Sequence, residues 1–413
     1  MKTLYYRLKQ KGGAALLVIL AVSSLILPLL QGVWLDSQVD YQFKRYHLSK
    51  MQARWNAQSG MGLSLLRLYI FKGIEKSTPK QMISLIRPIL DQIWLFPFSW
   101  PLLELEDMLE SDKDDLENLT KLSFFKGSYS LLISAEDGLF DVNDLSSPLP
   151  FLKDFIYDGL FNILWNTIQL NEDLKEKYDQ KDIEEILNNL SDWTDLDNES
   201  QNGGSETLIE EGKFPLNRSF ISIDEIRKVP KVNLEIFEIL KPHITTYGAK
   251  SLNINYTTEE ILLALQFPNG LAEQILLRTQ SDSEFYEPFL SQEDFCGFNR
   301  DQGFDWCEGI KTNYQSLDML NFNFPISFRI KSNGKYRNQL VELEGLLYDL
   351  SSSALNYQKA VYREQKRQDK KEEIDSFERN QGEDLPQTEK KEGIKFDYSY
   401  YKSLVIMFIK ENL

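Results

Sequence analysis

The sequence predicts an α+β protein in which a long N-terminal helix packs on an antiparallel sheet and a large α-helical domain is inserted between the strands. Three observations support this prediction. Apolar residues recur with helical spacing from the N-terminus to about residue 68, helical patterns fill the middle of the chain, and alternating patterns typical of strands flank that block. With 413 residues, 42% of them hydrophobic, the chain is large enough to bury such a core.

The apolar N-terminal stretch has the length of a membrane span. No charged residue occurs from Ala14 to Leu35, and a helix of that length covers about 30 Å, the hydrocarbon thickness of a bilayer. The residues before it are basic and those just after it are acidic: Lys2, Arg7, Lys9 and Lys11, then Asp36 and Asp40. The positive-inside rule therefore predicts a cytoplasmic N-terminus, with the bulk of the chain outside. A cleaved secretory signal is the alternative, but no small-x-small cleavage pattern follows.

The helical pattern continues beyond the apolar stretch as one stripe along a single face. The stripe consists of Val39, Phe43, Tyr46, Ala53, Ala57, Met61, Leu65 and Leu68. This predicts one continuous helix of more than about fifty residues, half in lipid and half on a globular part.

The remaining segments predict the order of the other elements. Two strand-like runs, 122–133 and 139–145, precede helical segments that fill 150–280. Alternation returns in "PISFRIKSNGKYRNQLVELEGLLYDL", where Asn333-Gly334 is typical of a hairpin turn, and "KFDYSYYKSLVIMFIKE" predicts a last strand. Residues 363–393 are nearly all charged or polar, which predicts a solvated, mobile loop.

The N-terminus resembles the type IV pilin and pseudopilin families, which keep a long apolar helix after removal of a short basic leader. In "KQKGGAALLVIL", the resemblance implies that a prepilin peptidase cuts after Gly13, so that Ala14 becomes the new N-terminus. Most members carry a glutamate at mature position five, where this chain has Val18.

Five later stretches, in order, resemble the K-type minor pseudopilin of type II secretion systems, general secretion pathway protein K. They are "QARWNAQSGMGLSLLRL" (52–68), "EDGLFDVNDL" (136–145), "LSDWTDLDNESQNGGSE" (190–206), "ISIDEIRKVPKV" (221–232) and "LNINYTTEEILLAL" (252–265). Lys231 stands where that family usually has glycine, and Tyr256-Thr257 where Thr-Ala is common. The K-type subunit is also the one that characteristically lacks the glutamate at mature position five.

The resemblance implies a pseudopilin fold and a subunit at the tip of the secretion pseudopilus, which primes and caps the fibre. Its implied partners are the I- and J-type minor pseudopilins, the major pseudopilin and the prepilin peptidase. The expected location is the inner membrane, crossed once, with the bulk of the chain periplasmic. The expected domains are a leader (1–13), a membrane-spanning part (14–35), the rest of the long helix with the first strands (36–149), an inserted helical domain (150–280), C-terminal strands with a cysteine loop (281–362), the charged loop (363–393) and a last strand (394–413).

The absence of the glutamate has a physical explanation at a fibre tip. In the fibre, that glutamate is thought to neutralise the free α-amino group of a neighbour inside an apolar bundle, where an unpaired charge is costly. A tip subunit has no subunit above it, so Val18 costs nothing there. Two alternatives stay open, a minor pilin of a type IV or DNA-uptake pilus and a single-pass periplasmic binding protein unrelated to pilins.

Two acidic clusters are candidate calcium sites. Asp195, Asp197 and Glu199 occupy positions one, three and five of an EF-hand-like spacing, with Glu206 at position twelve. An acidic surface loop without metal would look similar. The alternative cluster surrounds the two cysteines and contains Asp294, Asp301, Asp305 and Glu308.

Cys296 and Cys307 are the only cysteines. Once they are placed in an oxidising compartment, a disulfide is favoured over two buried thiols. Such a disulfide would hold the surrounding acidic loop.

Composition argues against two classes of function. The formal net charge of −17 makes a nucleic-acid partner improbable. Only His47 and His243 are present, and the chain carries no nucleophile, phosphate-binding or zinc-protease motif, so an enzymatic role is not expected.

Overall fold

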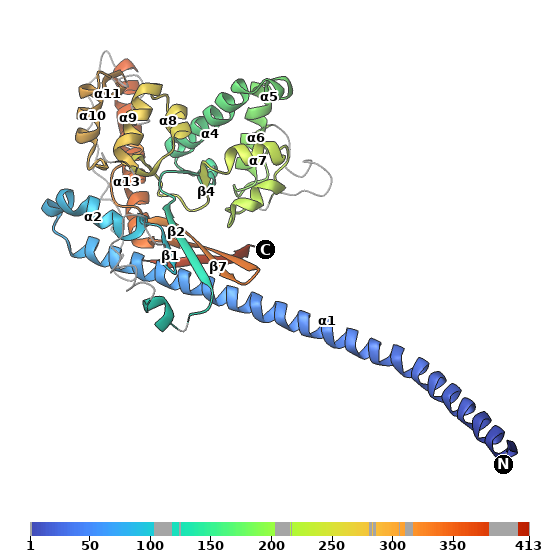
Figure 1. Cartoon of the computed structure of the whole chain (residues 1–413). Coiled ribbons are helices and arrows are strands. Elements are labelled where there is room, and N and C mark those ends of the chain that lie inside the picture. Colours follow the sequence, from blue (N-terminus) through green and yellow to red (C-terminus); the bar gives the residue numbers. More distant parts are fainter. Residues whose placement is uncertain are drawn as a thin grey trace.

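A computed structural model of the chain describes residues 2–102, 118–123, 125–202, 215, 217–280, 283, 286–304, 306–309, 317–379 and 404–412. Its longest element is α1 (Lys2–Ser77), which runs as one helix through Pro28. The N-terminal part of α1, up to Leu48, projects from the molecule and is called here the stem, whereas its C-terminal part lies on a sheet (Figure 1). The continuous helix predicted from the stripe is therefore present.

The main sheet has five strands in the order β1-β2-β7-β8-β9, and every neighbouring pair is antiparallel. The strands are β1 (Phe98–Trp100), β2 (Ser128–Ala135), β7 (Ser327–Tyr336), β8 (Gln339–Tyr348) and β9 (Val405–Asn412). Alternate residues of β7, such as Phe328 and Ile330, are fully buried beneath α1. The last predicted strand is thus found as β9, the edge of the sheet.

Small residues on α1 allow its backbone to lie directly against the sheet. Ala53 and Ala57 are completely buried, and the Ser332 hydroxyl of β7 donates a hydrogen bond to the Ala57 carbonyl at 2.8 Å. A Cβ on Gly334 would meet the Ala53 carbonyl oxygen at 2.1 Å and the Ala57 nitrogen at 2.2 Å. Only glycine fits at this crossing.

The hairpin turn predicted at Asn333-Gly334 is wrong. Asn333 and Gly334 lie inside β7, and the strands reverse at Arg337 and Asn338. Arg337 adopts the positive φ of 54° that the turn requires. The Asn-Gly pair suggests a turn, but its glycine is explained by the approach of α1.

A block of helices, called here the head, is inserted between β2 and β7. Its longer helices are α4 (Pro150–Leu170), α6 (Gln180–Asp192), α9 (Asn269–Thr279) and α10 (Gln292–Asp301), with shorter α5 (Glu172–Lys177), α7 (Leu234–Leu240), α8 (Glu259–Ala264) and α11 (Trp306–Gly309). The head lies on the side of the sheet away from α1 (Figure 1).

The head extends further along the chain than the predicted inserted domain, 150–280. Its apolar core begins at Phe140 and continues through Phe295 to Phe322, and the two cysteines pack against it. The cysteine segment therefore belongs to the head, although the sequence groups it with the C-terminal strands. Alternation is a local signal and does not reveal which core a short segment joins.

The two strand-like runs before the head are also shorter than predicted. In the first run, β2 begins only at Ser128. In the second, β3 (Phe140–Asp141) is followed at once by a 3₁₀ turn, η2 (Val142–Ser146), where the Asp141 side chain accepts the Asn143 N–H at 3.1 Å. β3 pairs in parallel with β4 (Ile244–Thr245) inside the head, and β5 (Leu252–Asn253) pairs likewise with β6 (Leu320–Asn321).

The charged segment after β8 differs from the predicted loop in its described part. Helix α13 (Leu350–Arg379) continues well past residue 363, whereas 380–393 lie outside the described residues. Lys, Arg, Glu and Gln are strong helix formers, and pairs such as Gln368 and Glu364, 3.2 Å apart, support the helix. High charge alone therefore does not predict a loop here.

A buried polar joint connects the head to the end of the long helix. Helix α2 (Ile83–Leu95) packs beside α1 and carries Arg87 and Asp91, which are 1% and 0% exposed. Arg87 donates hydrogen bonds to the carbonyls of Phe289, Phe322 and Asn323. Asp91 accepts the Tyr286 hydroxyl at 2.8 Å and lies 3.6 Å from Arg87 Nε. The two buried charges therefore face each other and polar groups, so that neither is left uncompensated in the interior.

Lys231 lies in a turn whose backbone would suit glycine. Lys231 has a φ of 67°, in the left-handed region that favours glycine. The turn is therefore formed without the glycine, at some cost in backbone strain.

Candidate assembly surface

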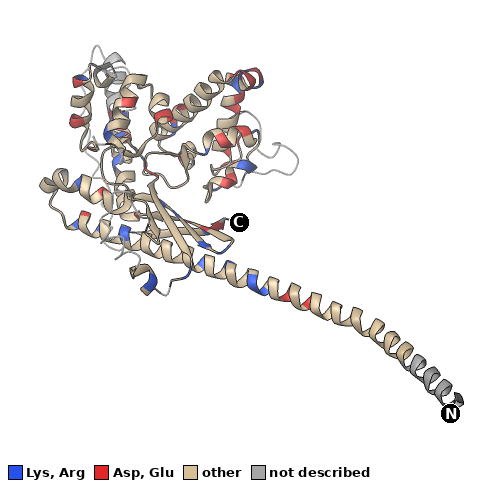
Figure 2. Cartoon of the chain, viewed as in Figure 1, with Lys and Arg blue, Asp and Glu red and all other residues tan. Residues whose placement is uncertain are grey.

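The stem of α1 is uncovered where its side chains are described, and it is apolar up to Leu35. Side chains from Leu16 to Leu35 are exposed almost without exception, and the first charged residues after this stretch are Asp36 and Asp40 (Figure 2). Within the described residues, one helix, α1, is long and apolar enough to cross a membrane. It fits a single-pass anchor, with the rest of the chain outside the bilayer.

The sheet covers only half of the stripe predicted along α1. Val39, Phe43 and Tyr46 are 67%, 61% and 49% exposed, whereas Ala53 and Ala57 are completely buried. One helix face thus continues from an intramolecular core on to an open surface. Exposed aromatic residues at helical spacing are typical of a surface that another molecule covers.

The residues predicted for processing lie in the stem. Gly13 and Ala14 are part of the helical backbone of α1, and the Val18 side chain is 63% exposed. Cleavage after Gly13 stays a prediction, because it depends on an enzyme and not on the fold.

The first acidic cluster forms a compact turn after α6. Asp197 accepts the Glu199 N–H at 2.8 Å, and Asp192, which the sequence analysis did not include, accepts the Ser200 hydroxyl at 2.8 Å. Burial, together with the neighbouring charges of Asp197 and Asp192, raises the pKa of Asp195 to about 6. Several carboxylates therefore lie close enough to repel one another.

This turn is not a complete metal site in the part of the chain that the structure describes. Glu206 lies outside the described residues. No group of three or more His, Cys, Asp or Glu able to hold a metal occurs among the residues that are described. Calcium at this turn remains a prediction.

The second acidic cluster is not assembled among the described residues either. Asp294 is engaged by Arg278, whose Nη2 lies 3.1 Å away, and it also accepts the Leu290 N–H at 3.0 Å. Asp301 is exposed at the end of α10, while Asp305 and the Glu308 side chain are not described. Asp294 therefore forms an ion pair with Arg278 and accepts a backbone hydrogen bond at the start of α10.

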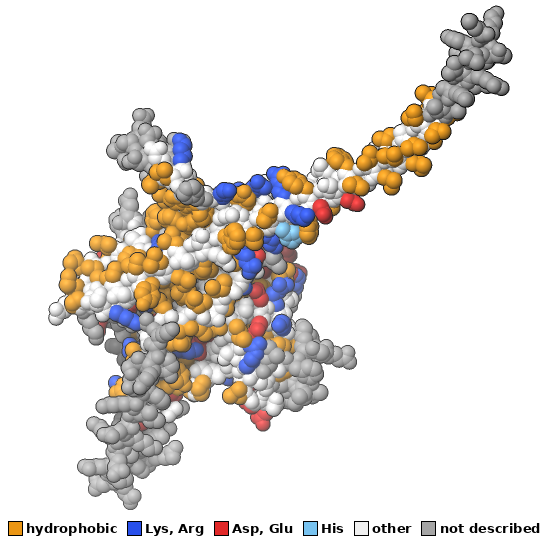
Figure 3. All heavy atoms as spheres, turned by 90° about the horizontal axis from the view of Figure 1, so that it is seen from below, with side chains coloured by type: hydrophobic (Ala, Val, Ile, Leu, Met, Phe, Trp, Pro, Cys, Tyr) orange, Lys and Arg blue, Asp and Glu red, His pale blue; other side chains and the backbone are white. Residues whose placement is uncertain are grey.

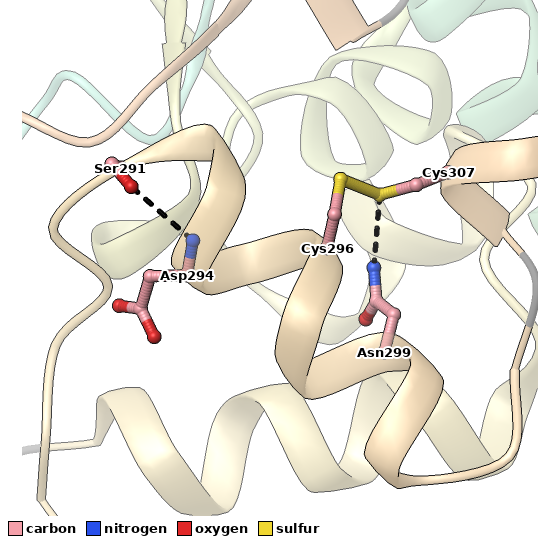
Figure 4. Close-up of a disulfide and its surroundings, with 5 residues drawn as sticks. All are labelled: Ser291, Asp294, Cys296, Asn299 and Cys307. Atoms are coloured by element: carbon pink, nitrogen blue, oxygen red, sulfur yellow. Dashed lines mark hydrogen bonds between the residues drawn. A yellow bond between two sulfur atoms is a disulfide. The ribbon is translucent and has the colours of Figure 1, made fainter.

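The two cysteines are joined in a disulfide that connects α10 to α11 (Figure 4). The Cα atoms of Cys296 and Cys307 are 5.7 Å apart, and the Asn299 amide lies 3.5 Å from the Cys307 sulfur. Next to them, Phe267 and Trp306 stack with ring centroids 3.9 Å apart. The disulfide thus closes a short loop against the apolar core of the head.

Comparison with known proteins identifies the architecture. No protein-family model matches the sequence, and no curated protein matches it. Among solved structures, the chain is similar to one in the GspK-GspI-GspJ complex of the type 2 secretion system from enterotoxigenic Escherichia coli, with a TM-score of 0.52 and 17% sequence identity. The alignment covers 75% of this chain and 95% of that chain. This chain has a GspK-like fold.

The GspK-like fold consists of a long N-terminal helix, an antiparallel sheet and further helices, all of which the sequence predicts. The sequence resemblance to the K-type pseudopilin and the structural similarity agree. At 17% identity, the similarity establishes the fold, and the role of the chain has to be argued from its surfaces.

Proposed function

We propose that this chain is a K-type minor pseudopilin at the tip of a type II secretion pseudopilus. There it primes and caps the fibre that exports folded proteins across the outer membrane. The observation that carries the proposal is the combination of a GspK-like fold with an uncovered apolar stem. The role is structural, and its chemistry is helix packing.

The stem has the properties needed in two successive environments. Its apolar residues up to Leu35 match a bilayer, and after extraction they would match a bundle of neighbouring helices. The exposed part of the stripe, Val39, Phe43 and Tyr46, would then pack on the I- and J-type minor pseudopilins and on the major pseudopilin below. The structurally similar protein was itself solved in a complex with GspI and GspJ, which supports this choice of partners.

The tip position is supported by the bulk of the head and by Val18. The head lies beside the sheet and away from the stem, where a second subunit stacked above would overlap with it (Figure 1). Val18 replaces a glutamate whose partner would be the amino group of a neighbouring subunit. Both features suit a subunit with subunits on one side only.

Cleavage by a prepilin peptidase tests the membrane arrangement and the family together. The full chain should be co-expressed with the peptidase, and its N-terminus then sequenced. We expect a mature chain that starts at Ala14, and a Gly13→Ile variant that remains at full length. A mature start elsewhere would contradict the proposal, because the peptidase acts on the cytoplasmic side after the leader glycine.

Calcium at the turn after α6 is a separate part of the proposal. The raised pKa of Asp195 indicates carboxylates that a divalent cation would relieve of mutual repulsion. Calorimetric titration of the full chain in detergent with calcium should release heat, and the double change Asp195→Ala and Asp197→Ala should abolish it. Asp173→Ala, an exposed acid of α5, is the matched control. Absence of heat in the unmodified chain would reject a measurable site.

A further inference from the structure

The side of α1 that faces away from the sheet is apolar and uncovered along the globular part of the molecule. Trp55, Leu66, Tyr69 and Ile70 recur on it at helical spacing and are 51%, 54%, 73% and 46% exposed. Figure 3, which views the molecule from below, shows hydrophobic side chains gathered on this side. An exposed apolar area of this extent is unusual on a protein that has no partner.

The charged residues of the same stretch all turn toward their own chain. Arg54 forms an ion pair with Glu411 of β9, at 3.1 Å. Arg67 donates hydrogen bonds to the carbonyls of Ile93 and Phe96, and Lys72 is buried beside Asp349. From residue 51 to residue 73, the outward side of α1 is therefore left without charge.

Helix α2, which packs beside α1, is also apolar on its exposed side, the reverse of an ordinary surface helix. Its two charged residues, Arg87 and Asp91, point inward to the joint with the head. Its outward residues Leu85 and Ile89 are each 74% exposed. A soluble helix normally places its charges in water and its leucines in the core.

Two glycines on the outward side of α1 have no role in the packing of their own chain. Gly62 and Gly73 are exposed, and a Cβ added to either would meet nothing within 4 Å. A glycine inside a helix costs about 1 kcal/mol relative to alanine. Small residues at such positions allow a second helix to approach closely, as they do between packed membrane helices.

The position of this surface decides between a bilayer and a protein as its occupant. From Leu35, the end of the apolar span, to Ile74 beside α2, the helix rises about 60 Å. The membrane that holds the stem therefore does not reach α2. The absence of charge argues equally against an acidic or a basic partner.

We propose that the outer face, formed by Trp55, Leu66, Tyr69, Ile70, Leu85 and Ile89, docks the long N-terminal helix of a second pseudopilin subunit. This inference rests on the proposed function and adds that α2 takes part in the contact. Gly62 and Gly73 on this side leave room for the backbone of a partner helix, and Asp40 and Lys44 separate the outer face from the apolar span of the stem. Because the inner side of α2 holds the head through Arg87 and Asp91, docking also fixes the head relative to the partner.

The test uses the full chain in detergent with full-length I- and J-type pseudopilins of the same secretion system. A photo-crosslinking residue is placed at Ile89 and, as a control, at Leu170, which ends α4 in the head and is 88% exposed. We expect a cross-link from Ile89 to one of the two partners and none from Leu170. The double change Leu85→Glu and Ile89→Glu should weaken association about tenfold or more, while Leu170→Glu leaves it unchanged.

The outcomes separate the two levels of the proposal. If the chain binds neither pseudopilin, both the proposed function and this inference fail. If it binds but Ile89 cross-links to nothing, or to a second copy of the same chain, only the inference fails. Gly62→Leu gives an independent readout, since it should weaken association without lowering the melting temperature, and unchanged association would contradict the proposed helix approach.

Discussion

The two halves of the α1 stripe carry the same sequence periodicity but meet different surroundings. Where the sheet of the same chain covers the stripe, the backbones nearly touch at Ala53 and Ala57, and the larger Met61 and Leu68 are buried further along. Where nothing in the described chain covers it, the residues are large, as at Phe43 and Tyr46. Periodicity alone thus does not distinguish an intramolecular contact from a surface available to a partner, whereas the burial of each residue does.

The largest effect on stability is expected at Gly334, where the sheet lies closest to the backbone of α1. Gly334→Val would place a side chain within 2.2 Å of the α1 backbone, so we expect a loss of about 3 kcal/mol or more of unfolding free energy. Gly62→Ala is the matched control on the open side of the same helix, and it should stabilise by up to about 1 kcal/mol. Thermal unfolding followed by circular dichroism measures both. Equal effects would show that α1 does not lie on β7 as described.

The stability of the globular part should also depend on pH, through a buried carboxylate at the end of β2. Asp137, fully buried where β2 ends, accepts the N–H groups of Ile326 and Ser327 at 2.9 and 2.7 Å. Burial raises its pKa to about 7, against the lowering effect of these hydrogen bonds and of nearby Lys72.

The sign of the effect follows from proton binding. An unfolded Asp titrates near pH 4, so between about pH 4 and 7 the folded chain binds more protons than the unfolded chain. Stability should therefore fall as the pH rises through this range, by at most about 1.4 kcal/mol per pH unit from this group. Melting temperatures at several pH values should show a shallower slope for Asp137→Asn than for the unmodified chain. Asp144, whose burial also raises its pKa to about 7, would retain part of the slope.

A third prediction concerns the exposed part of the stripe, where substitutions should weaken association but not stability. Phe43→Ser and Tyr46→Ser should leave the melting temperature within experimental error, because neither side chain touches the sheet, but should weaken binding to the partner pseudopilins about tenfold. Met61→Ala, on the same stripe but 4% exposed, should instead destabilise by about 2 kcal/mol. If the two substitutions in the stem lower stability as Met61→Ala does, the stem is covered by its own chain.

Local patterns were sufficient to predict the elements whose cause is local. The long helix, the helical block and the alternating strands at β7, β8 and β9 all follow from periodicity. Helix α2 was not predicted, because its charged residues point inward and its leucines outward, so the usual rule assigns its faces the wrong way round. The role of Gly334 could not be predicted either, since its cause is the approach of a helix more than about 270 residues away in sequence.

The candidate site was likewise predicted only in part from the sequence. The stem and its stripe are visible in the sequence because one helix contains them. Asp192, which shares the turn with Asp195 and Asp197, falls outside the EF-hand-like spacing, and only the turn of the chain back to Ser200 brings it close. The outer face depends on two helices packed side by side and on the burial of Arg87 and Asp91, which no periodicity indicates.

The smallest effect is expected at the boundary between the two halves of α1. Arg54 lies one turn inside the covered half, where its Nε is 3.1 Å from Glu411 of the edge strand β9. Its side chain is 55% exposed, so Arg54→Ala should cost less than about 1 kcal/mol and less still in high salt. Hydrogen exchange should nevertheless quicken in the first covered turns, around Ser49 to Ala57, because the ion pair holds α1 to the edge of the sheet. Lys44→Ala removes a comparable pair with Asp40, 3.8 Å apart and 74% exposed on both sides, yet lies in the stem and should change neither quantity. If both variants quicken exchange equally, the boundary lies closer to the membrane than Ser49, and part of the stem is covered by its own chain.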